Sequence, residues 1–427
     1  MYLKNIELSN FKMFEKLKLD FEKDYTILVG VNGVGKSTVL EAVSVALGAY
    51  ISGIQGVQGR NFVNSEIRRE TVELGSRKEN TYQLPISVKG VAHLIDEGKD
   101  ICWERRQNTL KGRTLVKPSR NLINYGKKVD QELMRGNKDI ILPVIAFYGT
   151  DRIYNRNMVY EKDFHSRKEA YNNCLTSMTN SMTMISWFRE MTYIELQEGK
   201  QIPELEAVKK AVVKCFEGEK PGCRDINLQY AVKESALILE YIDDDDTPKK
   251  IPVDMLSDGL RVTLMMVADI AYKMAVLNPQ LFSDVLEKTP GIVMIDEIDM
   301  HLHPSWQRRI VTDLCSIFPE VQFIMTTHAP GILANVTHSH IRLLKNDSVY
   351  EAEISTYGKS TDEILKQIMG VDVTPGNVIK LKKEFYKLID SEEYEKAKET
   401  LEKLEKLIGR DNASYVEAQT TLELEML

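Results

Sequence analysis

Gly30-Val-Asn-Gly-Val-Gly-Lys-Ser37 fits the P-loop pattern G-x-x-x-x-G-K-[ST]. In such a loop, backbone N–H groups wrap phosphates, the lysine reaches the β- and γ-oxygens, and the hydroxyl ligates magnesium. The apolar run 25–29 before it indicates a buried strand, and 39–48 after it has helical periodicity ending at a glycine. Strand, loop and helix in this order predict a site for ATP and Mg²⁺. The predicted nucleotide ligands are Gly30, Val31, Asn32, Gly33, Val34, Gly35, Lys36, Ser37 and Thr38.

Two carboxylates follow a second apolar run, Gly291-Ile-Val-Met-Ile-Asp-Glu297. At the exposed end of a buried strand, one carboxylate can hold hydrated magnesium and the other can activate water. We assign Asp296 and Ser37 to magnesium and Glu297 to the general base. Such a pair also occurs at ordinary strand-to-loop junctions, but here it lies downstream of a P-loop and before another buried strand.

A histidine ends that next strand, Phe323-Ile-Met-Thr-Thr-His328. An imidazole there can donate a hydrogen bond to the γ-phosphate and sense its loss. A lone histidine is usually structural, so the order of the strands carries this interpretation. The predicted catalytic residues are therefore Lys36, Glu297 and His328.

Leu256-Ser-Asp-Gly-Leu-Arg261 places a serine and a glycine at the start of a predicted helix, where N–H groups and the helix dipole favour phosphate. Together, the four motifs resemble the head of an ABC-type ATPase over about residues 1–350. In that superfamily the signature, here Ser257 and Gly259, contacts the γ-phosphate of ATP held by the opposite protomer. Asp299 matches the D-loop, which connects the two sites. The resemblance thus implies ATP-dependent dimers formed head to head.

Asp296-Glu-Ile-Asp-Met-His-Leu-His-Pro304 is similar to the branch that contains OLD-type and SMC-related proteins and differs from the transporter pattern. His301 and His303 lack an evident third metal ligand. No clear Q-loop glutamine follows Tyr148, and Gly149-Thr-Asp-Arg152 occupies that place, with Arg152 a weak candidate.

Most proteins of that branch carry additional regions that this sequence does not match. SMC proteins and zinc-hook ATPases insert long heptad arrays between P-loop and signature, and none is present here. OLD nucleases add a Toprim domain with acidic metal ligands, whereas the residues after His328 are mainly charged and helical. The chain is most similar to the PtuA family, the ATPase subunits of Septu-type antiphage systems, on its compact head and on the tail segment Gly409-Arg-Asp-Asn-Ala-Ser-Tyr-Val416. That resemblance implies an HNH endonuclease partner of the PtuB type, and the alternative is a RecF- or SMC-like DNA clamp gated by ATP.

The fold class expected is α/β, an ABC-type P-loop head with mixed N-terminal strands, a parallel core sheet, a helical insertion lobe and a helical tail. Residues 165–218 and 379–427 indicate helices, and 236–242 with 251–253 indicate a hairpin with an acidic tip. The predicted parts are 1–50 (head with P-loop), 51–150 (strand-rich head with a basic segment), 151–235 (helical lobe), 236–350 (head with signature, acidic pair and histidine) and 351–427 (tail for partner binding or oligomerisation).

Composition bounds the remaining function classes. The 427 residues contain 56 basic and 63 acidic side chains, a net charge of -7 that argues against a uniformly basic nucleic-acid coat. The five cysteines form no C-x-x-C pair, so neither a disulfide framework nor a zinc site is indicated, and we expect a cytoplasmic location. The sequence contains no run of 18 apolar residues, so it predicts no membrane-spanning helix.

One segment is locally basic. Residues 103–138 hold ten Lys or Arg against three acidic residues, a net charge of +7 that could follow a phosphate backbone. A solvated lobe would have the same composition, and sparse aromatic residues argue against stacking on single-stranded bases. DNA is therefore a possible partner on charge alone, through Arg105, Arg106, Lys111 and Arg113.

Overall fold

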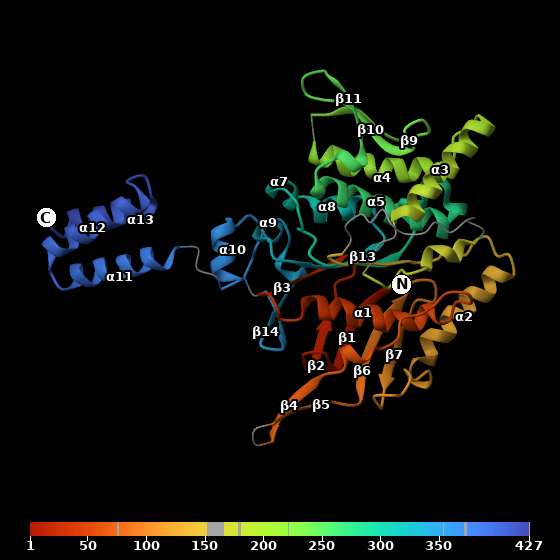
Figure 1. Ribbon diagram of the computed structural model, residues 1–427, viewed down its shortest axis with the longest axis horizontal. Coiled ribbons are helices and arrows are strands. Elements are labelled where there is room, and N and C mark those ends of the chain that lie inside the picture. Colours follow the sequence, from red (N-terminus) through yellow and green to blue (C-terminus); the bar gives the residue numbers. More distant parts are fainter. Residues whose placement is uncertain are drawn as a thin grey trace. The chain divides into compact units, whose positions relative to one another are not determined.

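The computed structural model (Figure 1) describes residues 1–74, 77–151, 166–177, 181–220, 222–352, 354–370 and 374–426. They form two compact units, Met1–Lys359 and Ser360–Leu427.

Buried parallel strands form the central sheet of the first unit. In spatial order its strands are β15 (Ser348–Glu351), β14 (Ile341–Lys345), β3 (Tyr25–Val29), β13 (Val321–Thr327), β12 (Gly291–Ile295) and β8 (Val144–Tyr148). All neighbours are parallel except β14 and β15, which pair antiparallel. Every residue of β8, β12 and β13 is buried, as expected for apolar strands covered on both faces. The predicted parallel core is confirmed.

The strand register puts three predicted motifs at one edge of this sheet. Val29, the last residue of β3, lies opposite Thr327 at the end of β13. Ile295, the last residue of β12, lies opposite Met325 of β13 on one side and Tyr148 of β8 on the other. The P-loop, the acidic pair and His328 each follow one of these strand ends, so the topology alone brings them together.

Strands from the N-terminal part of the chain form an antiparallel sheet in the first unit. Its spatial order is β2 (Phe14–Asp20), β1 (Tyr2–Phe11), β6 (Ile86–Leu94) and β7 (Lys99–Gln107), and β4 (Arg69–Leu74) pairs with β5 (Arg77–Tyr82) as a separate hairpin. The turn-prone pair Ser9-Asn10 lies inside β1. β1 continues to Phe11, which pairs with Phe14, and both rings are buried. Burying two aromatic side chains outweighs the turn preference of serine and asparagine.

Helix α1 (Lys36–Ile51) lies between the two sheets. It contacts β13 of the central sheet and β1, β6 and β7 of the antiparallel sheet, which explains why nearly all its residues are buried. The predicted helix end at Gly48 is wrong because the helix continues to Ile51. A Cβ at Gly48 would collide with the Arg60 carbonyl, so this glycine serves close packing rather than termination. Helix α2 (Arg120–Met134), which was not predicted, contacts α1 and β7.

The opposite side of the central sheet carries the longer helices. Figure 1 shows α5 (Asp258–Leu277) and α8 (Ile310–Ile317) across β13 from α1, with α4 (Pro203–Glu219) and α3 (Ser181–Glu198) beyond them. Before α8 the chain forms the short helix α7 (Pro304–Gln307), and Arg308 and Arg309 separate the two helices. The apolar run over 140–148 forms a strand only from Val144 onward, because Pro143 cannot donate a ladder hydrogen bond.

The insertion lobe contains strands as well as helices. After α4, the chain forms an antiparallel sheet of β9 (Arg224–Ala231), β10 (Ala236–Ile242) and β11 (Pro248–Pro252). The predicted hairpin with an acidic tip is confirmed, since Ile242 pairs with Pro248 across Asp243–Thr247, but its second strand spans Pro248–Pro252 rather than 251–253. The expectation of a helical lobe over 151–235 missed β9, in which Leu228 and Tyr230 are buried at alternate positions. The remaining short elements are η1 (Asn64–Glu66), η2 (Lys117–Ser119), η3 (Arg167–Tyr171), η4 (Val253–Met255), η5 (Pro279–Asp284), α6 (Val285–Lys288), α9 (Pro330–Leu333) and η6 (His338–His340).

The second unit is helical and has its own core. It contains α10 (Thr361–Gln367), α11 (Gly376–Asp390), α12 (Tyr394–Ile408) and α13 (Ala413–Glu425). The apolar stripes of the last three helices meet in a cluster of buried residues, which comprises Val378, Phe385, Ile389, Ala397, Leu401, Leu404, Tyr415, Ala418 and Leu422. The predicted helical tail is confirmed. Within the described parts of both units, no helix has the length and apolar character that crossing a bilayer requires.

Candidate active site

The P-loop connects the buried end of β3 to the first turn of α1. Gly33 and Gly35 have φ angles of 82° and 94°, a left-handed conformation that glycine adopts at little cost. A Cβ at Gly35 would collide with the Phe14 ring and lie 2.7 Å from the Met13 sulfur, so the β1–β2 turn lies against the loop. Ser37 is exposed in the first turn of α1, whose N–H groups have no partners within the helix.

Lys36 lies at the centre of the site. Its ammonium group donates to the carbonyls of Gly30, at 3.0 Å, and Val31, at 3.2 Å. Burial lowers the pKa of Lys36, while the nearby carboxylates of residues 296, 297 and 299 act to raise it. The lysine of one motif and the acids of another, far apart in sequence, are therefore electrostatic neighbours.

Asp296 and Glu297 follow the last residue of β12, and hydrogen bonds hold both in a defined conformation. The Asp296 N–H donates to the Tyr148 carbonyl at 2.8 Å, and its buried carboxylate accepts a 2.6 Å hydrogen bond from the Thr326 hydroxyl. The N–H of Glu297 donates to the same hydroxyl at 2.7 Å. Glu297 itself has φ 47°, and a left-handed backbone costs a non-glycine residue about 1–2 kcal/mol. The chain therefore turns sharply at the predicted base.

Asp299 and His328 are joined through the end of β13. The Asp299 carboxylate accepts hydrogen bonds from the Thr327 hydroxyl, at 2.6 Å, and from the His328 backbone N–H, at 3.3 Å. Burial lowers the pKa of the His328 imidazole, the Lys36 ammonium lowers it further, and the three nearby carboxylates oppose both effects. The ring is therefore neutral at neutral pH and offers one N–H donor.

The signature segment starts helix α5 at the protein surface. Ser257 is exposed, and its hydroxyl does not cap its own helix. Gly259 is buried, and a Cβ there would collide with the carbonyl of His301. The signature is thus packed directly onto the turn that follows Asp299.

These residues fit a nucleoside triphosphate with a divalent cation. The left-handed glycines leave the P-loop backbone open to phosphate, the buried Lys36 supplies a cation, and the Asp296 carboxylate is a hard oxygen ligand. Bound there, Mg²⁺ would neutralise phosphate charge, and Ser37 and Asp296 would hold it. In the described parts of the chain, no cluster of three or more His, Cys, Asp or Glu forms an all-protein metal cage. His303 instead accepts from the Ser305 N–H and caps α7.

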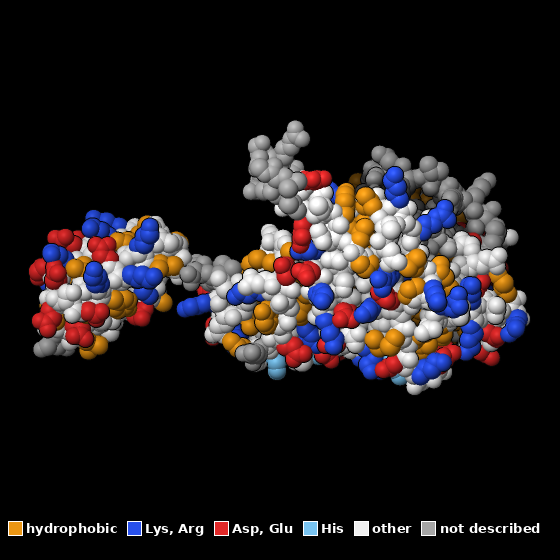
Figure 2. Space-filling view, turned by 90° about the horizontal axis from the view of Figure 1, so that it is seen from below, with side chains coloured by type: hydrophobic (Ala, Val, Ile, Leu, Met, Phe, Trp, Pro, Cys, Tyr) orange, Lys and Arg blue, Asp and Glu red, His pale blue; other side chains and the backbone are white. Residues whose placement is uncertain are grey.

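The predicted DNA-contacting residues differ in their exposure. Arg105 is only 2% exposed, and its guanidinium donates to the Arg60 carbonyl at 2.8 Å and to the Asn61 side chain at 2.6 Å. Its assignment to DNA is therefore wrong, because β7 turns this side chain inward. Arg106 is half-buried and donates to Asn108, while Lys111 and Arg113 are exposed. On the face drawn in Figure 2, Lys and Arg side chains alternate with Asp and Glu.

Sequence reasoning missed several residues of the site. Thr326 and Thr327 bind the acidic residues directly, Tyr148 anchors Asp296, and Met13 and Phe14 pack on the P-loop. The two threonines immediately before His328 were a visible signal, but threonine is common in strands. Arg152, the weak Q-loop candidate, lies outside the described residues.

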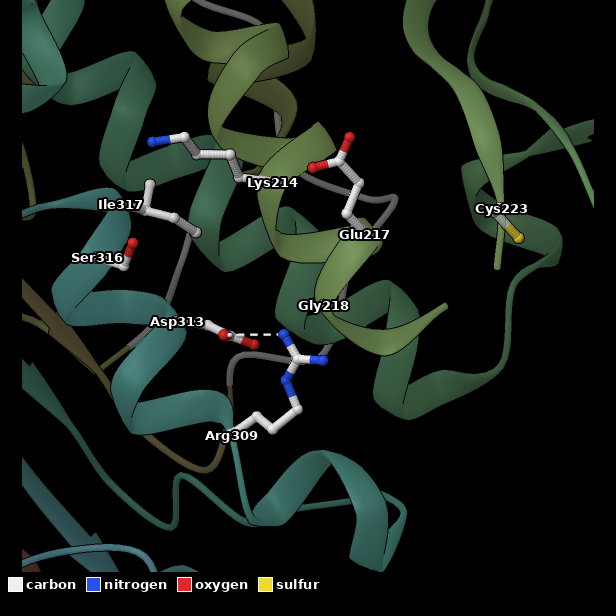
Figure 3. Close-up of a pocket in the computed structure, with 8 residues that line it drawn as sticks. All are labelled: Lys214, Glu217, Gly218, Cys223, Arg309, Asp313, Ser316 and Ile317. Carbon is white, nitrogen blue, oxygen red and sulfur yellow. Dashed lines mark hydrogen bonds and ion pairs between the residues drawn. The ribbon is translucent and has the colours of Figure 1, made fainter. Parts of the chain in front are cut away.

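A separate pocket of about 530 Å³ lies between α4 and α8 (Figure 3). Its lining mixes both charges, with Lys214 and Arg309 beside Glu217 and Asp313. Arg309 and Asp313 form an ion pair at 3.4 Å, and burial raises the pKa of Asp313. None of the predicted catalytic residues lines this pocket, so it is distinct from the nucleotide site.

Comparison with known sequences agrees with this geometry. The retron Ec83 probable ATPase of Escherichia coli is 27% identical over 98% of this chain and 86% of the relative. The retron Vc95 probable ATPase of Vibrio cholerae serotype O1 biovar El Tor is 26% identical over 85% of this chain and 78% of the relative. Septu protein PtuA of Bacillus thuringiensis is 23% identical over 96% of this chain and 95% of the relative, which confirms the predicted resemblance.

Two family profiles divide the head between them. Residues 233–334, which include the signature, the acidic pair and the histidine, match a family described as AAA domain, putative AbiEii toxin, Type IV TA system. Residues 5–218, half of the chain, match a family described as AAA domain. The chain belongs to this AAA-domain family, and it is an ATPase.

Proposed function

We propose that this chain is the ATPase subunit of an antiphage defence complex, in which ATP bound between paired heads assembles and regulates a partner HNH endonuclease. The similarity to the Septu and retron ATPases extends over nearly the whole chain, tail included, which supports a common role. The RecF-like clamp is the alternative that the experiments must separate from it.

Within one head, the described contacts support a complete hydrolytic site. Lys36 and the N–H groups of the P-loop bind the β- and γ-phosphates, and Ser37 and Asp296 hold the magnesium ion. Glu297 accepts the proton of the attacking water. The neutral His328 donates its N–H to the γ-phosphate.

The proposed pairing of two heads depends on the exposed N-terminus of α5. Among the described residues, the exposed Ser257 hydroxyl does not cap its own helix, and with the N–H groups of the first turn it offers a site for an anion. Its neighbour Gly259 is held against the His301 carbonyl, in the turn after Asp299. A second head that brings its ATP to this helix end would complete both sites of the pair.

Pairing is tested with a variant that binds ATP and does not consume it. Glu297→Gln with ATP and Mg²⁺ should have twice the monomer mass or more by light scattering, and without nucleotide the increase should be absent. Ser257→Arg in the same background should keep ATP binding but lose the mass increase, because a long cation obstructs the helix end. Lys36→Ala is the matched control that should lose binding itself. A Glu297→Gln protein that binds ATP yet never pairs would overturn the proposal.

The identity of the partner is tested in the native host. Mass spectrometry of proteins that co-purify with the native chain should identify an HNH endonuclease, encoded beside this chain. If only DNA co-purifies, and no nuclease gene is adjacent, the RecF-like clamp replaces the defence assignment while the ATPase assignment stands.

A further inference from the structure

Two adjacent threonines end strand β13, and both are fully buried. Thr326 and Thr327 pair with Leu28 and Val29 of β3, directly before the P-loop. They therefore lie between the strand that leads to the P-loop and the strand that leads to the acidic pair. Each hydroxyl donates a hydrogen bond to an acidic residue of the active site and accepts one from a nearby backbone N–H.

Thr326 organises the residues that surround the reacting phosphate. Its hydroxyl donates to the Asp296 carboxylate at 2.6 Å and accepts from the Glu297 N–H at 2.7 Å. Its carbonyl also accepts from the N–H of Ile298, at 3.0 Å. Three consecutive residues of the turn are thus held by one threonine.

These hydrogen bonds matter because Glu297 has an unfavourable backbone conformation that they hold in place. A glutamate with φ 47° is held in a region that ordinary side chains avoid, and such residues persist only where their surroundings hold them. The bonds to Thr326 fix the N–H of Glu297 and of the residue after it. Without the hydroxyl, the turn can relax and redirect the Glu297 carboxylate.

Thr327 organises a different set of residues. Its hydroxyl donates to the Asp299 carboxylate at 2.6 Å and accepts from the Ala329 N–H at 3.0 Å. The same Asp299 oxygen accepts from the His328 N–H. Thr327 therefore joins the turn that packs against Gly259 to the segment that carries His328.

We propose that the two threonines are positioning residues with separate tasks. Thr326 orients Asp296 and Glu297 for the chemical step within one head. Thr327 orients Asp299 and His328 for ATP-driven pairing with a second head. The first task rests only on the ATPase assignment, and the second also rests on the proposed pairing.

Valine and serine distinguish the hydroxyl from the shape of the side chain. Valine keeps the β-branched shape of threonine but cannot hydrogen-bond, whereas serine keeps the hydroxyl and loses only a methyl group. Thr326→Val should lower kcat for ATP hydrolysis at least tenfold, leave the Kd for ATP within threefold and raise the Mg²⁺ concentration needed for half-maximal rate. Thr326→Ser should stay within threefold of the unmodified protein in all three quantities. Equal kcat in the valine variant, or equal loss in both variants, would overturn the first task.

Pairing is measured in the Glu297→Gln background, where turnover plays no part. Adding Thr327→Val should weaken ATP-driven pairing at least tenfold, Thr327→Ser should restore it, and Thr326→Val should leave it within threefold. Pairing that resists Thr327→Val overturns the second task. If Glu297→Gln alone does not pair, the proposed function fails instead, and the kcat test of Thr326 still decides the first task. Thermal unfolding of every variant should remain close to that of its parent, and a valine variant that is unfolded instead shows a structural role and overturns the task assigned to that threonine.

Discussion

The edge of the central sheet and the basic segment 103–138 differ in how distance along the chain relates to distance in the structure. At the sheet edge, Lys36, Glu297 and His328 come from distant parts of the chain and meet, because each follows the end of a parallel strand. In the basic segment, neighbours in sequence separate, because β7 alternates and turns Arg105 inward beside the half-buried Arg106. A motif tied to a strand end thus predicts a site, and a local excess of charge does not.

The alternation in β7 explains the separation further. Trp103, Arg105 and Gln107 all point inward and are almost fully buried. The Trp103 indole donates to the Ala46 carbonyl of α1, at 2.9 Å. Burial also lowers the pKa of the Arg105 guanidinium to about 10, which still leaves it charged at neutral pH. This side of β7 therefore binds α1 and the segment around Arg60 rather than a nucleic acid.

The largest expected effect tests the sheet edge. Glu297→Gln removes the general base and keeps the size of the side chain, so turnover should fall by about 10²–10⁴-fold. ATP binding should persist, because the P-loop and Lys36 are unchanged. Single-turnover phosphate release and nucleotide titration measure the two quantities separately. Turnover within threefold of the unmodified protein would remove Glu297 from its role.

The next effect tests whether the signature depends on its packing. Gly259→Ala introduces a Cβ into the position of the His301 carbonyl, so the turn or the helix must shift. ATP-driven pairing should be lost, while binding of ATP to the P-loop of the single head remains within threefold. Asp258→Ala is the matched control, because Asp258 is exposed and precedes the same glycine. Pairing that survives Gly259→Ala would show that the close approach of Gly259 to His301 is dispensable.

Stability distinguishes the two arginines of β7. Arg105→Met leaves the Arg60 carbonyl and the Asn61 side chain without their donor and should lower the free energy of unfolding by about 2 kcal/mol. Arg106→Met should change it by less than about 0.5 kcal/mol, because this arginine makes only a local bond to Asn108. Urea unfolding of both variants provides the comparison. Equal stability losses would contradict the inward and outward assignment.

Much of this fold could be predicted because strand ends and motif spacings are local signals. β3 has the predicted bounds, and β12 and β13 were recognised by their apolar runs. Helix α2 was missed because its sequence is rich in charged residues and asparagine, and only contact with α1 shows which side is buried. The roles of Thr326 and Thr327 were missed for a similar reason. A threonine in a strand acquires a role in the site only when residues that follow another strand lie within hydrogen-bonding distance of it. No local sequence pattern predicts that contact.

The smallest expected effect concerns the part of the basic segment that remains exposed. Lys111→Glu with Arg113→Glu should leave the free energy of unfolding within about 0.5 kcal/mol, because both side chains are exposed. If they bind a DNA backbone, the slope of log affinity against log salt should flatten by about 2, close to one unit for each phosphate that is no longer neutralised. Lys16→Glu with Lys18→Glu, exposed on β2, gives the same change in net charge elsewhere on the head. DNA retention that responds equally to both pairs reports net charge alone, and retention that ignores the first pair leaves the segment a solvated surface. A response confined to Lys111 and Arg113 would show that a small group of charges on this face can be specific even though the segment as a whole is divided by its strand.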